Sequence, residues 1–207
     1  MKHQTAAMWS FWKNDLKFSR RLTLLGFVLV IAITFVVGLL MPAIPQKVMS
    51  FFSSFVADAG IMDDEGNFSA LAIFGNNIRA MLVTVCCGFL PFIFLPAFSL
   101  CLNAALLGLF AAQYVNAGQS LWVYLAGILP HGIFELPAIV IAAACGFYLC
   151  NTLTDYVRHN PQGVVKPALL NLVRVFLIVI FPLLVAAAVV EAHVTPAVMA
   201  YIQQILS

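Results

Sequence analysis

Three ionisable side chains stand within apolar stretches of this sequence: His131, Glu135 and Glu191. If these stretches cross a membrane, each charged group costs ~2.5–3.5 kcal/mol to insert, so such residues usually face a protein interior and have a partner. His131 and Glu135 are four positions apart, which places them on one face of a helix. An imidazole and two carboxylates are also ligand types that bind zinc. These three residues form the candidate functional cluster.

The residue types of this cluster leave three interpretations open. A structural network would join two helices through hydrogen bonds between polar side chains. A site for a divalent metal such as zinc would use His131, Glu135 and Glu191 as ligands, with His193 as an additional candidate; the ligand types fit, but the spacing does not match the HExxH pattern. A proton or ion pathway would use the same groups in relay.

Other polar residues occur near the ends of apolar stretches and are secondary candidates. They are Asn76, Asn77, Arg79, Asn103 and His193. We expect Arg79 to reach the membrane interface, where it can contact a lipid phosphate, or to pair with a carboxylate of the cluster.

The composition identifies the solvent around these residues as lipid. Of 207 residues, 63% are hydrophobic and 9% are charged, and the mean hydropathy is +1.03; soluble domains carry roughly one quarter charged residues. The net charge is only +2, and the cations flank apolar spans and form no separate patch, which excludes nucleic acid as a partner. The sequence therefore predicts one integral membrane domain over residues 1–207.

The elements that must position the cluster are helices. An apolar run of about 20 residues crosses the hydrocarbon core once, so we expect an all-α polytopic bundle with about five transmembrane helices. The predicted spans are residues 22–41, 78–95, 97–115, 131–150 and 175–190. Residues 1–21 read as a basic interfacial lead-in, and residues 42–77 as an extracytoplasmic loop that contains an amphipathic helix and an acidic turn. Pro91 and Pro96 predict the turn between the second and third spans.

The distribution of cations predicts the orientation in the cell membrane. Lys and Arg near span ends are retained in the cytoplasm, and with five spans the N-terminal stretch and the loop before the last span share one side. The N-terminus is therefore predicted to be cytoplasmic and the C-terminus extracytoplasmic. The depth of His131 stays open: if residues 121–129 lie at the outer interface, the cluster converges, whereas if Leu121 starts the crossing, Glu191 lies a turn or two too high.

Several motifs together resemble the stage II sporulation protein M family of membrane proteins. They are Asn76-Asn77-Ile78-Arg79, Asn103 followed by Gly108, Pro130-His131-Gly132-Ile133-Phe134-Glu135-Leu136-Pro137-Ala138, and Glu191-Ala192-His193-Val194-Thr195-Pro196. The resemblance covers most of residues 70–196. In spore formers it implies a membrane subunit that works with the sporulation proteins D and P, which remodel peptidoglycan during engulfment.

Two classes of function follow, with a third as a weaker alternative. The resemblance favours a non-catalytic scaffold of a cell-envelope remodelling complex, with the bilayer and peptidoglycan-remodelling proteins as partners. The cluster alone favours an intramembrane metal-dependent hydrolase, in which Glu135 or Glu191 activates a metal-bound water. A small transporter would require a homodimer to build its pathway.

Overall fold

The computed structural model describes residues 16–58 and 70–206, and within these ranges the chain forms helices and turns without a strand. Among the described residues, five helices are long and apolar enough to cross a membrane, which confirms the predicted all-α membrane bundle. Most of the predicted lead-in at residues 1–21 lies outside the described residues. The acidic turn at residues 63–66 lies outside them as well.

The helices follow one another with short connections. Their bounds are α2 (Leu16–Leu40), α3 (Ala43–Asp58), α4 (Ala70–Cys86), α5 (Pro96–Asn116), α6 (Leu121–His159), α7 (Val165–Val175), α8 (Phe181–His193) and α9 (Thr195–Leu206). A 3-10 turn (Cys87–Phe89) follows α4, and a π-helical segment (Phe176–Ile180) joins α7 to α8. The turn between α4 and α5 lies where the two prolines predicted it.

Several helices extend beyond the predicted spans. The second spanning helix begins at Ala70 and not at residue 78. The fourth, α6, extends past both ends of 131–150: it begins where the Ser120 hydroxyl accepts a hydrogen bond from the Trp122 amide, and it ends at Asn160, whose φ of 48° is left-handed. Such end caps, and not the limits of hydrophobicity, decide where a helix stops.

The core of the molecule is α6, which packs against α2, α4, α5, α8 and α9. Its segment from Ala138 to Cys145 is buried throughout. The next residue, Gly146, faces the α4–α5 hairpin: a Cβ there would lie 2.8 Å from the Thr84 carbonyl oxygen and 2.7 Å from Pro96 Cγ. The absence of a side chain therefore sets how closely the hairpin approaches α6.

Small residues also bring α2 and α5 together. Ala104, Gly108 and Ala112 recur every fourth position on the buried face of α5. Gly38 of α2 faces the same row, because a Cβ there would lie 2.6 Å from Ala112 Cβ. Small residues at such spacing let two membrane helices approach closely and gain van der Waals contact.

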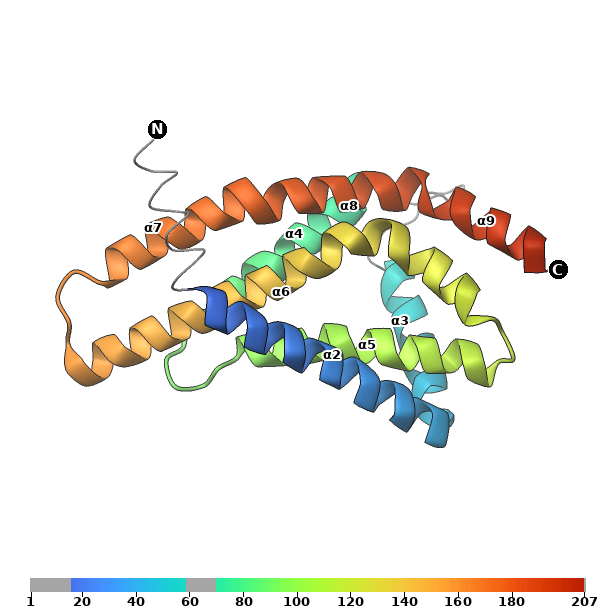
Figure 1. The fold of residues 1–207 in the computed structure, drawn as a ribbon, viewed down its shortest axis with the longest axis horizontal. Coiled ribbons are helices and arrows are strands. Elements are labelled where there is room, and N and C mark those ends of the chain that lie inside the picture. The colour runs from blue at the N-terminus through green and yellow to red at the C-terminus, as the bar shows by residue number, and fades with distance from the viewer. Residues whose placement is uncertain (1–15, 59–69, 207) are drawn as a thin grey trace.

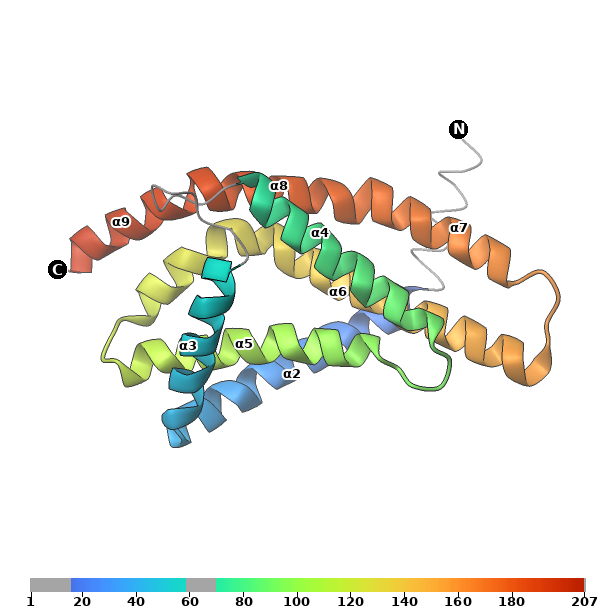
Figure 2. The same ribbon diagram turned by 180° about the vertical axis from the view of Figure 1, so that it is seen from behind.

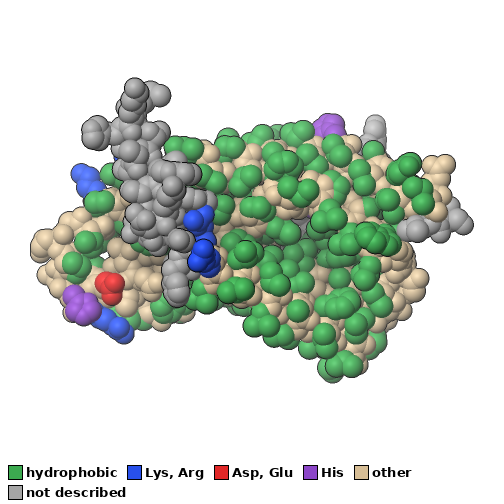
Figure 3. All heavy atoms as spheres, viewed as in Figure 1, with side chains coloured by type: hydrophobic (Ala, Val, Ile, Leu, Met, Phe, Trp, Pro, Cys, Tyr) green, Lys and Arg blue, Asp and Glu red, His purple; other side chains and the backbone are tan. Residues whose placement is uncertain are grey.

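The spanning helices alternate in direction along the long axis of the molecule (Figure 1). As a result, the start of α2 lies in the same half of the molecule as the α6–α7 connection, while α9 lies at the opposite end. Figure 3 shows Lys and Arg side chains toward the end where α6 runs into α7, and hydrophobic side chains over most of the same face. The orientation of these cations relative to the membrane stays a prediction.

The helix expected within residues 42–77 is α3, and it lies across α5 (Figure 2). Phe52 of α3 meets Phe110 of α5 edge to face, with ring centroids 5.1 Å apart. Edge-to-face pairs of this kind stabilise a contact beyond the apolar area they bury. This contact makes α3 a wall of the site described next.

Candidate functional site

The site lies at a bend in α6. Pro130 and Pro137 are both inside this 39-residue helix, and each removes a backbone donor that a straight helix would use. Kinks in helices are commonly located at such prolines, and α6 changes direction between its N-terminal part, beside α9, and its long C-terminal part (Figures 1 and 2). The bend presents His131 and Glu135 toward the junction of α8 and α9.

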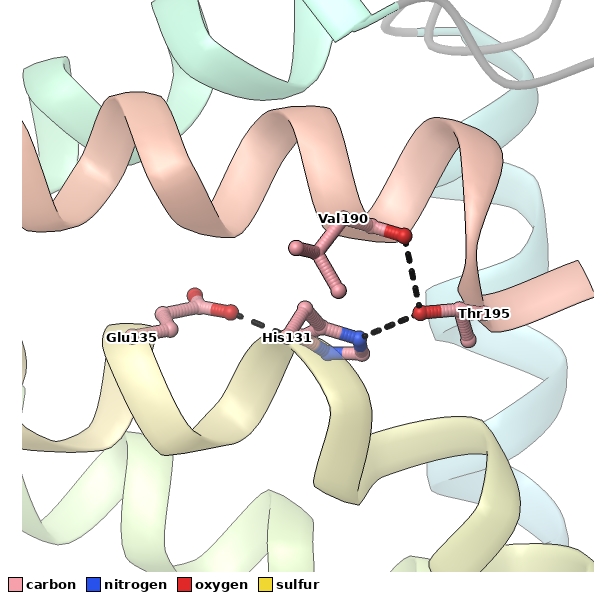
Figure 4. Close-up of polar contacts among 4 residues, drawn as sticks. All are labelled: His131, Glu135, Val190 and Thr195. Atoms are coloured by element: carbon pink, nitrogen blue, oxygen red, sulfur yellow. Dashed lines mark hydrogen bonds and ion pairs between the residues drawn. The ribbon is translucent and has the colours of Figure 1, made fainter. Parts of the chain in front are cut away.

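His131 is joined to that junction through a threonine (Figure 4). The Thr195 hydroxyl donates to the Val190 carbonyl oxygen at 3.3 Å, and His131 Nδ1 lies 3.3 Å from the same hydroxyl oxygen. Since the hydroxyl proton is already used, Nδ1 carries the hydrogen and donates it to Thr195. On the other side of the ring, Nε2 lies 3.8 Å from Glu135 Oε2.

Glu191 of α8 completes the cluster. One potential ligand atom from each of His131, Glu135 and Glu191 lies within 4.8 Å of the other two, and all three residues are half-buried. The structure thus brings together the three residues that the sequence singled out. The three residues converge although α6 begins at Leu121, because the bend in α6 brings His131 close to Glu191.

The cluster faces a cavity of about 660 Å³ among α3, α4, α5, α6 and α8. The polar side chains that line it are Ser53, Asn76, Asn77, Asn103, His131, Glu135 and Glu191. The rest of the wall is apolar and includes Phe52, Ile73, Phe110 and Ile139. Concave sites that combine an apolar wall with a few polar groups are typical of ligand-binding pockets.

The cavity has an excess of negative charge. None of the described residues that line it is Lys or Arg, while two are glutamates. Apart from His131 beside Glu135, no hydrogen-bond donor among the described residues reaches either carboxylate. A network that served only to join helices would be expected to satisfy its acceptors. These carboxylates are instead available to a cation or a hydrogen-bond donor in the cavity.

The secondary candidates divide into two groups. Asn76, Asn77 and Asn103 line the cavity with the cluster. Arg79 is exposed and forms no ion pair with the described residues. His193 is exposed as well, with Nδ1 3.0 Å from the Val189 carbonyl oxygen. The structure therefore separates both from the cluster that they were expected to complete.

The sequence did not identify Thr195 or the helix α3 as contributors to the site. Thr195 is four positions after Glu191, a spacing that would have suggested a shared helix face, but its apolar surroundings hid its role. Phe52 and Ser53 belong to α3, whose partner could not be identified from an amphipathic pattern alone. Both contributions depend on contacts between helices that are distant in sequence.

The donor set fits a divalent cation. Imidazole nitrogen and carboxylate oxygen both ligate zinc, manganese and iron(II), and a histidine that donates its second N–H to another group is the usual arrangement in metal sites. Three protein ligands facing an open cavity also match catalytic zinc sites, which keep a position for water or substrate. When bound, such an ion would supply a Lewis acid at the cavity wall.

Comparison with known proteins places the chain in a family. The family described as Stage II sporulation protein M matches residues 23–196, which includes most of α2, a helix outside the segment that carries the sequence motifs. An uncharacterized protein of the archaeon Methanocaldococcus jannaschii is 28% identical over 138 residues, covering 65% of this chain and 75% of that protein. No solved structure matches the chain.

Proposed function

Because this chain belongs to the stage II sporulation protein M family of membrane proteins, we propose that it is a non-catalytic scaffold subunit of a cell-envelope remodelling complex. The family match over residues 23–196 is the observation that carries this proposal. Peptidoglycan remodelling is the process that the family resemblance implies. The scaffold resides in the cell membrane with its N-terminus in the cytoplasm.

The shape of the molecule supports a scaffold. The connections between α4 and α5, between α5 and α6, and between α6 and α7 are short, so these parts of the chain hold no soluble catalytic domain. Many side chains of α2 point away from the bundle, among them Leu25, which is 68% exposed, and Leu29, which is 60% exposed. Such a surface contacts lipid or the transmembrane helix of a partner.

Cross-linking in living cells tests the scaffold. A photo-reactive amino acid at Leu25 or Leu29 is expected to capture a peptidoglycan-remodelling protein or its membrane anchor, identified by mass spectrometry. The matched control places the same amino acid at Leu184, a leucine that is fully buried in α8 and should capture no partner. Cross-links confined to lipid, or to other copies of this chain, would contradict the proposal.

A second candidate, an intramembrane metal-dependent hydrolase, is favoured by a separate observation. The cluster opens into a cavity of about 660 Å³, which leaves room for a substrate beside the ligand atoms. A scaffold uses Glu135 and Glu191 only to hold its fold, and glutamine keeps their shape and hydrogen-bonding capacity, whereas a hydrolase needs the carboxylates themselves. The variant Glu135→Gln/Glu191→Gln should therefore restore normal envelope remodelling to cells that lack the protein if it is a scaffold, and fail to do so if it is a hydrolase.

A further inference from the structure

We propose that His131, Glu135 and Glu191 bind one divalent transition-metal ion, with Thr195 as the residue that positions the histidine. The ion belongs to the zinc, manganese or iron(II) class and lies on the cavity wall. This inference goes beyond the scaffold function and is independent of it. The hydrolase candidate requires such an ion, but the ion site does not require the hydrolase.

The first step of the argument is distance. The three ligand atoms lie within 4.8 Å of one another, and His131 Nε2 lies 3.8 Å from Glu135 Oε2. Metal–ligand bonds of about 2.0–2.2 Å in tetrahedral geometry place ligand atoms ~3.4 Å apart. Small rotations of side chains suffice to reach this separation. The 3.8 Å gap is too long for a direct hydrogen bond between the two groups.

The second step is the state of the histidine ring. Because the Thr195 hydroxyl donates to the Val190 carbonyl, it accepts a hydrogen bond from His131 Nδ1. The neutral ring then has its lone pair on Nε2, the nitrogen that faces Glu135. This is the tautomer and the orientation that a metal ligand needs, and outer hydrogen bonds of this kind are what fix them.

The third step is charge. Glu135 and Glu191 approach each other on a wall without Lys or Arg among the described lining residues. Two carboxylates in a region of low dielectric repel each other strongly unless one of them takes up a proton or a positive charge lies between them. The Nε2 lone pair of a neutral His131 adds a third electron-rich group. A divalent cation is the ligand that satisfies all three at once.

The ligand set narrows the class of ion. Carboxylates alone suit magnesium and calcium, but an imidazole nitrogen favours zinc and related transition ions. Three protein ligands leave at least one coordination position toward the cavity. The amides of Asn76, Asn77 and Asn103 line the same space and can hydrogen-bond a water or ligand at that position.

Metal binding by the full-length protein in detergent tests the site. The purified protein is stripped with a chelator, and zinc chloride or manganese chloride is added during calorimetry and, separately, during thermal unfolding. We expect one equivalent to bind, and the unfolding midpoint to rise with metal concentration, because an ion that binds only the folded state stabilises it. Magnesium chloride at the same concentration should have little effect.

Variants assign the site to these residues. Two variants, Glu191→Gln and Glu135→Gln, keep the shape of the side chain but remove its charge. Each should lower zinc affinity by at least about 100-fold, which is more than the 10–100-fold loss expected when a metal ligand loses its outer hydrogen bond. Thr195→Val removes only that outer bond, and should lower affinity by about 10–100-fold. His193→Asn and Asp155→Asn, which change exposed residues outside the cavity, should bind zinc as the wild type does.

The outcomes decide the proposal even if a variant folds poorly. Circular dichroism of each metal-free variant reports folding, and the zinc-dependent midpoint of the wild type does not depend on any variant. The proposal is overturned if the folded wild type binds no stoichiometric zinc or manganese. It is equally overturned if both glutamine variants, correctly folded, bind zinc as tightly as the wild type.

Discussion

His131 Nδ1 and the Thr195 hydroxyl oxygen lie 3.3 Å apart, and this contact joins the bend of α6 to the junction of α8 and α9. The hydroxyl in turn donates to the Val190 carbonyl oxygen of α8. Thr195 is 6% exposed, so water does not readily replace it. One buried hydroxyl therefore fixes both the packing of two helices and the direction in which the histidine presents its second nitrogen.

Replacing this threonine should destabilise the metal-free protein. Thr195→Val keeps the volume but leaves the Nδ1 hydrogen of His131 without an acceptor, and an unsatisfied buried group costs about 1–3 kcal/mol. We expect a lower midpoint of thermal unfolding in detergent, followed by circular dichroism. Thr195→Ser, which keeps the hydroxyl, should be closer to the wild type. Equal stability of the valine and wild-type proteins would show that this contact contributes nothing.

Removing one carboxylate should stabilise the metal-free protein, whereas replacing Thr195 should destabilise it. Glu191→Gln relieves repulsion with Glu135, whose ligand atom lies within 4.8 Å, and a stabilisation on the order of 1 kcal/mol is expected after solvent screening. The measurement is the unfolding midpoint of chelator-treated protein. Asp155→Asn, which changes an exposed carboxylate on α6, should leave the midpoint unchanged. A lower midpoint for Glu191→Gln would identify Glu191 as part of a stabilising hydrogen-bond network.

The contact between Gly146 of α6 and the α4–α5 hairpin should not tolerate a methyl group. A Cβ on Gly146 would lie 2.8 Å from the Thr84 carbonyl oxygen, and forcing extra atoms into a packed contact typically costs about 1–3 kcal/mol. Gly146→Ala should therefore reduce the yield of folded protein and its unfolding midpoint. Gly26→Ala is the matched control, since a Cβ on that helical glycine has no neighbour within 4 Å. If both variants behave alike, the packing of the hairpin against α6 is looser than described.

Reporter fusions test the orientation. A reporter fused after Ser207 should be active only outside the cytoplasm, and one inserted within residues 160–164 only inside it. The reason is that Lys and Arg near span ends are retained in the cytoplasm, and the start of α2 lies in the same half of the molecule as the α6–α7 connection. Reversed activity at either position would refute the five-span, N-in orientation.

The sequence by itself determined the parts of this protein that depend on local physics. Runs of about 20 apolar residues can cross a bilayer only as helices, because backbone groups in lipid must bond within their own segment. The number of spanning helices and the turn before Pro96 therefore followed directly. The pairing of His131 with Glu135 also followed, since residues four apart in a helix share a face.

Only the tertiary structure decided which distant residues meet. Glu191 reaches Glu135 because α6 bends and packs against α8. The direction of the bend and the packing partner cannot be predicted from the sequence of one segment alone. Thr195 became part of the site through the same contact, and α3 became a wall of the cavity through Phe52 and Phe110. Helices in a bilayer form from local hydrogen bonds and hydrophobicity, but their contacts depend on the shapes of facing surfaces, which exist only after the helices have packed.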